Sequence, residues 1–244
     1  MVVIGYSQSN ADHTLFIKRF GEKIAIIIVY VDDTIITGDD LKEISHLERY
    51  LSEEFEIKDL EQLRYFLGIE VAKSSHEIYL SHQKYVIELL SEIDILGCKS
   101  IDTLIEANGH LSSKEGDPID KGRCQRLVRL LIYLSHTRFD IAFFISLVSQ
   151  YMHDPYSIHM KVVLHILRYL KFTPGCGIIF SSHDRLRVEA FTDADWVGSP
   201  DDRRSTTSYC TFVGDNIVTW YSKKQAVVAH SSVKAKFRAM DARR

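Results

Sequence analysis

The run Ile24–Val31 contains eight consecutive apolar residues and ends at two adjacent aspartates, Asp32 and Asp33. A short apolar run bounded by turn residues is typical of a strand. A second such run, His13–Phe20, precedes it across Gly21-Glu22-Lys23, so the sequence predicts a β-hairpin here. Adjacent carboxylates at a strand end repel each other unless a cation lies beside them, so the pair is a candidate metal site.

The rest of the first half predicts further strands and two helices. Asp39 and Asp40 are suited to cap the first helix. In chain order, these elements are a strand over 34–37, a helix over 40–55, a hairpin of strands over 63–71 and 77–80, and a helix over 82–95.

The second half opens with a polar, irregular segment, 98–120, that we interpret as a linker. The elements expected after it are helices over 121–136, 138–152 and 157–171, strands over 177–180, 186–192, 206–213 and 217–222, and a helix from about 231. The predicted fold class is α+β. It comprises an antiparallel hairpin sheet with helices, a three-helix segment, and a mixed sheet with one helix.

The composition excludes several classes of protein. The chain has 244 residues, of which 45% are hydrophobic and 26% charged, which is unlike a disordered chain. Its longest apolar-rich runs, Ile24–Val31 and Ile141–Val148, are far shorter than the roughly 20 residues that cross a bilayer, so we expect no membrane association. We see no signal-peptide pattern and no zinc-site spacing among the four cysteines, which predicts a reduced intracellular protein, cytoplasmic or nuclear.

The formal net charge of -3 hides a difference between the two halves. Residues 1–122 carry 12 Lys and Arg against 23 Asp and Glu, a net charge of -11, whereas residues 123–244 carry 18 against 10, a net charge of +8. A basic half is suited to a polyanion such as nucleic acid. Two ordinary solvated surfaces explain the same counts equally well.

A second acidic motif, Thr192-Asp193-Ala194-Asp195-Trp196, follows an apolar-alternating strand, which places the Asp193 carboxylate at the end of a sheet. Four basic residues nearby are suited to phosphate contacts, although a plain basic surface is the alternative. They are Arg203, Arg204, Lys223 and Lys224. Trp196 and Trp220 are suited to base stacking, but tryptophans near a sheet more often belong to a core. Taken alone, Asp32-Asp33 is likewise more typical of a turn.

Long motifs follow one another along nearly the whole chain. The first half contains DHTLFIKRFGEKIAIIIVYVDDTIITGDD, LRYFLGIEV and LSHQKYVIELL, and the second contains QRLVRLLIYLSHTRFDIAF, HILRYLKFTPG, TDADWVGSPDDRRSTTSYCTFVG and VTWYSKKQAVVAHSS. In this order they closely resemble the Pol polyprotein of copia-type LTR retrotransposons.

The resemblance implies three segments: the C-terminal part of a reverse transcriptase with its palm hairpin and a thumb-like region over 1–110, a helical connection over 111–175, and a truncated ribonuclease H-like domain over 176–244. It implies RNA-directed DNA synthesis and cleavage of RNA in RNA–DNA hybrids, both dependent on Mg²⁺. The partner would be an RNA–DNA hybrid or a primed template. Asp32 and Asp33 match the metal-binding signature of the reverse transcriptase, and Asp193 matches the aspartate that opens the ribonuclease H metal site.

The sequence departs from the family where more carboxylates are needed. The family's reverse transcriptase uses another aspartate far upstream of the hairpin, and 31 residues precede Asp32 here. The family motif Ser-Ser-Ala-Glu-Ala-Glu has lysines, Lys234 and Lys236, in place of its glutamates, and the sequence ends before a further catalytic aspartate. An ammonium repels a metal ion and is not a ligand, although it can grip phosphate. We therefore expect a catalytically inactive chain.

Three other interpretations stay open at this point. The chain is a non-catalytic binder of RNA–DNA hybrids, a decayed reading frame that does not fold stably, or an enzyme completed by residues of another chain. Smaller departures from the family at Leu104, Arg129, Phe139 and Phe172 favour loss of activity. The sequence leaves the oligomeric state open.

Overall fold

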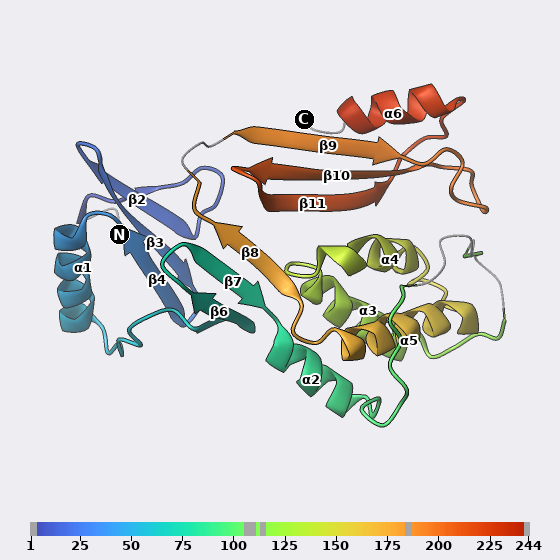
Figure 1. Cartoon of the computed structure of the whole chain (residues 1–244), viewed down its shortest axis with the longest axis horizontal. Helices are drawn as coiled ribbons and strands as arrows, with labels where there is room; N and C mark the ends of the chain where they lie inside the picture. The colour runs from blue at the N-terminus through green and yellow to red at the C-terminus, as the bar shows by residue number, and fades with distance from the viewer. Residues whose placement is uncertain (1–3, 105–110, 113–115, 184–186, 242–244) are drawn as a thin grey trace. The chain divides into compact units, whose positions relative to one another are not determined.

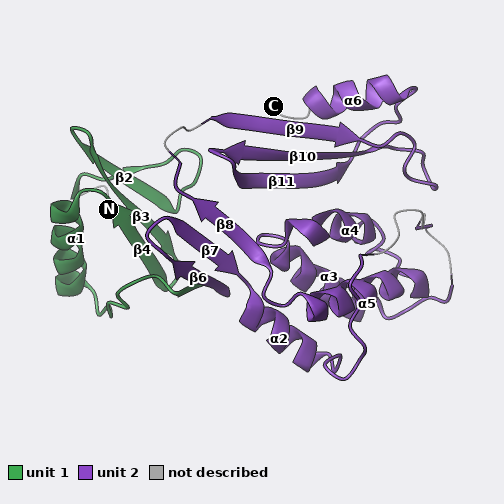
Figure 2. Ribbon diagram, in the orientation of Figure 1, with its two compact units in different colours: residues 1–66 green, residues 67–244 purple. Residues whose placement is uncertain are grey.

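The structure, a computed structural model, describes residues 4–104, 111–112, 116–183 and 187–241 (Figure 1). These residues form an α+β fold of six helices and eleven strands, as the sequence predicts for the fold class. The chain divides into two compact units, residues 1–66 and 67–244 (Figure 2). Among the described residues, no helix combines the length and apolar character that crossing a membrane requires.

Unit 1 is a four-stranded antiparallel sheet with one helix packed on it. The elements are β1 (Ser7–Gln8), β2 (Leu15–Phe20), β3 (Lys23–Tyr30), β4 (Asp33–Gly38), α1 (Leu41–Glu54) and the short strand β5 (Tyr65–Phe66). Alternate residues of the apolar run, Ala25 and Ile27, are buried together with Leu47 and Leu51 of α1. The first hairpin and the Asp40 cap of α1 are confirmed, since the Asp40 carboxylate accepts the Glu43 N–H at 3.3 Å.

Unit 2 begins with the second predicted hairpin, which the structure confirms. Its strands are β6 (Ile69–Lys73) and β7 (Glu77–Ser81), and a third strand, β8 (Gly177–Ser181), pairs antiparallel with β7. Gly177, the first residue of β8, pairs with Ser81 of β7. A side chain at residue 177 would collide with the Leu80 carbonyl, so this close approach of the two strands requires glycine.

The pairing of β8 corrects the prediction of a mixed C-terminal sheet. That sheet contains only β9 (Val188–Ala194), β10 (Thr206–Val213) and β11 (Asn216–Lys224), in the order β11-β10-β9, and its described pairs are antiparallel. The prediction was wrong because a short apolar run such as Gly177–Ser181 predicts a strand but not the strand it pairs with. The three-segment division at 110/111 and 175/176 is a division by function and stays a prediction.

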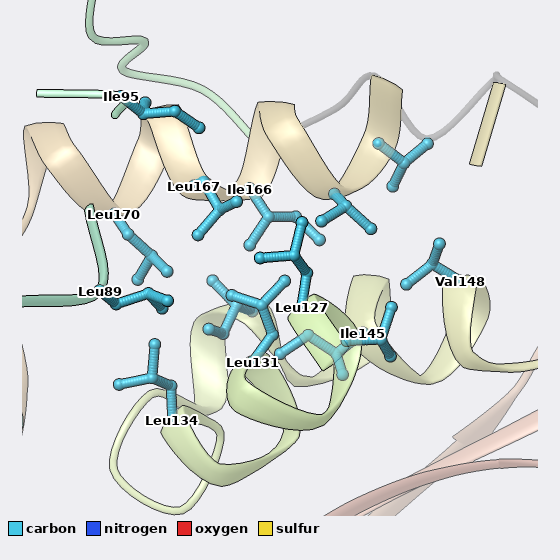
Figure 3. Close-up of a cluster of buried hydrophobic side chains, with 14 of the residues drawn as sticks. Leu89, Ile95, Leu127, Leu131, Leu134, Ile145, Val148, Ile166, Leu167 and Leu170 are labelled. Carbon is cyan, nitrogen blue, oxygen red and sulfur yellow. The ribbon is translucent and has the colours of Figure 1, made fainter. Parts of the chain in front are cut away.

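Four helices enclose the largest hydrophobic core. They are α2 (Gln83–Glu92), α3 (Lys121–Leu134), α4 (Phe139–Ser149) and α5 (Ser157–Phe172), close to the predicted ranges. Figure 3 shows Leu127 and Leu131 of α3 meeting Ile166 of α5 and Ile145 of α4. The predicted linker 98–120 lies partly outside the described residues, and its described part has no helix or strand. Leu111 from it is nevertheless buried in this core.

The C-terminal sheet of β9, β10 and β11 contacts two helices, α6 and α4. The helix α6 (Ser232–Asp241) packs on it through small residues, Ala194 of β9 with Ala235 and Ala239 of α6. On α4, Ser146 Oγ donates to the Ser222 carbonyl at 2.8 Å. The Trp220 indole donates to the Ser135 carbonyl at 2.8 Å and lies edge-on to Phe139, so Trp220 serves packing.

Truncation of Leu131 should destabilise unit 2. Leu131 is fully buried in the helical core, and shortening a buried leucine to alanine costs about 2–5 kcal/mol through lost burial and a cavity. The neighbouring Ile132 is 38% exposed, so Ile132→Ala is the matched control and should cost much less. Urea unfolding of both variants measures the difference, and equal losses would contradict the core as described.

His82 is a buried imidazole between α2 and α3. Its Nδ1 lies 2.6 Å from Thr137 Oγ1, and its Nε2 has no hydrogen-bond partner among the described residues. Burial, with a smaller effect from His136, lowers the pKa of His82 to about 4.

The stability of the protein should therefore fall in mild acid because of His82. An unfolded histidine titrates near pH 6.5, so the stability from its neutral form is complete above that pH and is lost as the pH falls toward 4. We expect a loss on the order of 3 kcal/mol that His82→Gln removes. Urea unfolding at several pH values between 7 and 4 measures it, and parallel curves for wild type and variant would refute it.

Candidate metal and nucleic-acid sites

The carboxylates of Asp32 and Asp33 lie at the tip of the β3–β4 hairpin. Tyr30 pairs with Asp33, so Val31 and Asp32 form a two-residue turn between the strands. Val31 has a φ of 49°, which is strained for a β-branched residue, and its side chain is exposed. The register of the apolar strands thus places both residues at the tip of the hairpin, where both are exposed.

This tip fits a divalent ion only in part. Mg²⁺ uses one or two protein carboxylates and fills its remaining positions with water and substrate phosphates, which suits Asp32 and Asp33. Within the described residues, however, no group of three or more possible ligand side chains comes together. The hairpin supplies two ligands and no complete metal site.

Asp193 lies near the end of β9, at the edge of its sheet, and its side chain is 77% exposed. Its neighbour Ala194 is buried against Ala235 of α6. The next helix residue, Lys236, places its Nζ 3.7 Å from Asp193 Oδ1. The sequence predicted an ammonium near this carboxylate, and the structure brings the two together.

The Asp193 position does not fit a divalent ion. The Lys236 ammonium lies 3.7 Å from Asp193 Oδ1, and a divalent ion about 4 Å from an ammonium is repelled by about 2 kcal/mol even in water. Asp195, the other carboxylate of the motif, accepts the N–H of Thr206, the first residue of β10, at 2.6 Å. Neither residue is placed to complete a metal site.

The four predicted phosphate-binding residues fall into two kinds. Lys224 Nζ lies 2.9 Å from Asp202 Oδ1, and Arg204 Nε lies 3.5 Å from Asp202 Oδ2. Partial burial would raise the pKa of Asp202, but hydrogen bonds from Lys224 and Ser199 outweigh it and lower the pKa. Asp202 therefore neutralises part of this basic cluster.

Arg203 and Lys223 differ from that pair because they are exposed and form no ion pair within the described residues. The sequence analysis missed the role of Asp202, although Asp201-Asp202 stands directly before Arg203 and signals local pairing. Trp196 is 54% exposed, with its indole N–H on the Ala229 carbonyl at 3.1 Å, so its ring face stays accessible to a base.

Residues 1–107 match the family described as reverse transcriptase (RNA-dependent DNA polymerase). The chain is 36% identical over 241 residues to the retrovirus-related Pol polyprotein from transposon RE1 of Arabidopsis thaliana, covering 98% of this chain and 16% of the polyprotein. It is 33% identical over 245 residues to the corresponding polyprotein from transposon TNT 1-94 of Nicotiana tabacum, covering 95% of this chain and 18% of that one.

A shorter relative matches over most of its length. An uncharacterized mitochondrial protein of Arabidopsis thaliana is 36% identical over 217 residues, which are 88% of this chain and 89% of that protein. No solved structure matches the chain. This chain thus spans less than a fifth of the two polyproteins. By its sequence it belongs to the copia-type family of retrotransposon Pol polyproteins.

Proposed function

We propose that this chain is a segment of a copia-type reverse transcriptase and ribonuclease H that binds RNA–DNA hybrids or primed templates and catalyses neither reaction. The observation that carries the proposal is the Lys236 ammonium beside Asp193, where catalysis would need a divalent ion. It lies where the family resemblance places a glutamate.

The reverse-transcriptase part of the proposal rests on the hairpin. The family match over residues 1–107 includes the β3–β4 turn, whose Tyr30–Asp33 carries the polymerase signature. We assign residues 1–110 to the palm and thumb-like region and 111–175 to the connection. Asp32 and Asp33 would hold Mg²⁺ in part, and when bound it would supply charge stabilisation at phosphate oxygens.

The ribonuclease H-like part covers residues 176–244 in this proposal. Three antiparallel strands and one helix, β9, β10, β11 and α6, follow in the chain order of the family motifs, with Asp193 on the first strand. The exposed Arg203 and Lys223 are the residues we assign to phosphates, while Asp202 holds Arg204 and Lys224. The cytoplasmic or nuclear location stays a prediction.

Neither reaction should occur with Mg²⁺. We would incubate the chain with an RNA template annealed to a shorter DNA primer, each strand end-labelled, beside Asp33→Asn and Asp193→Asn variants. Both strands should stay unchanged in every sample, because the described residues give neither acidic site a third ligand side chain. An extended primer or a shortened RNA that the matching variant abolishes would overturn the inactive assignment.

Hybrid binding should depend on salt and on the two unpaired cations. Phosphate contacts release counterions, so affinity should fall steeply as salt rises from about 50 to 200 mM. Arg203→Ala and Lys223→Ala should each weaken binding and lower the salt slope by about 1, whereas Arg204→Ala, which removes a residue already paired with Asp202, should change it less. Fluorescence anisotropy with a labelled hybrid measures this, and a flat salt response would rule out phosphate binding.

A further inference from the structure

We propose that Lys236 takes the place of a divalent cation at Asp193, so that this edge of the sheet contacts the phosphodiester group of a nucleic acid without metal. The phosphate part rests on the proposed function above. The replacement of the metal rests on the family resemblance that places a metal ligand at Asp193, and Mn²⁺ binding tests it separately from hybrid binding.

The position of Lys236 follows from how α6 is held. Ala235 and Ala239 are buried against Ala194, and such small side chains let the helix lie close to β9. Gln225 Nε2 also donates to the Ala235 carbonyl at 2.9 Å. These two contacts hold the backbone of α6 at Ala235. The backbone of the next residue, Lys236, is therefore held beside the edge strand β9.

The charge of the pair decides what can bind beside it. A glutamate at 236 would give the two residues a charge of -2, and a phosphate could approach only with a cation between them. With Lys236 the pair is neutral, and at 3.7 Å the ammonium is in ion-pair contact with Asp193 Oδ1, beyond hydrogen-bond distance. Its three N–H donors belong to a side chain that is 61% exposed, so a phosphate oxygen can reach them.

Two consequences separate this arrangement from a plain surface ion pair. Once Asp32 and Asp33 are replaced by asparagine, hybrid binding should not change with Mg²⁺. A single reversal of charge at residue 236 should then create a divalent-ion site that depends on Asp193. Lys234 provides a control for the effect of charge alone. It lies on the same helix, is exposed and forms no ion pair among the described residues.

The first test measures Mn²⁺ alone by electron paramagnetic resonance, in an Asp32→Asn/Asp33→Asn background that removes the hairpin ligands. Lys236→Glu should bind Mn²⁺ at least roughly tenfold more tightly than the background chain, since each unit charge near 4 Å matters even in water. Adding Asp193→Asn should abolish the gain, and Lys234→Glu should not produce it. No gain in Lys236→Glu, or Asp193-dependent Mn²⁺ binding with Lys236 present, would overturn the proposal.

The second test compares hybrid binding in Mg²⁺ and in EDTA at constant ionic strength. In the same Asp32→Asn/Asp33→Asn background, the chain with Lys236 should bind equally in both, whereas Lys236→Glu should bind weakly in EDTA and regain affinity in Mg²⁺. Tighter binding in Mg²⁺ by the background chain that keeps Lys236 would contradict the replacement. No hybrid binding at all would remove the phosphate part together with the proposed function, while the Mn²⁺ result would still decide whether Lys236 replaces a metal.

Discussion

The buried guanidinium of Arg138 is the contact on which the arrangement of unit 2 depends. It is 1% exposed, forms two hydrogen bonds with the Asp140 carboxylate at 3.0 and 2.7 Å, and donates to both the carbonyl and Oγ1 of Thr173 at 2.8 Å. Burial would lower the pKa of Arg138, but the ion pair with Asp140 outweighs it and raises the pKa. Breaking such a pair costs about 3–5 kcal/mol, so this contact fixes the start of α4 against the end of α5.

The position of the C-terminal sheet, β9 to β11, depends on the start of α4. Since β11 rests on α4 through Ser146 and on the α3–α4 corner through the Trp220 indole, the position of β11 follows from the helices. The Asn216 side chain adds a second attachment, accepting the Ser181 N–H at 2.7 Å and donating to the Ser181 carbonyl at 2.8 Å. The sheet that carries Asp193 is thus held by directional polar contacts on α4 and β8, which suits a surface that presents charged groups in fixed positions.

Local signals in the sequence predicted most helices and strands, but the sequence did not predict contacts between residues far apart in the chain. The apolar run before Asp32 and the cap at Asp40 involve neighbours in the chain, so the strand β3 and the helix α1 could be found from sequence alone. The pairing of β8 with β7 joins residues nearly a hundred positions apart, and nothing in a five-residue strand names its partner. For Trp220 the sequence favoured a core position over base stacking, and its contacts with Ser135 and Phe139 agree, although the sequence did not identify those partners.

At the candidate sites, the composition predicted which charged residues are present but not which of them form ion pairs with one another. The +8 charge of residues 123–244 suggests a strongly basic face, but several of its cations form ion pairs. Arg138 is bound to Asp140, Arg126 to Glu92, and Asp202 holds two more cations. Exposed residues such as Arg203 and Lys223 remain for phosphates, and binding through such contacts is sensitive to salt. Selectivity for an RNA–DNA hybrid would then have to come from the shape of the duplex across the sheet edge rather than from net charge.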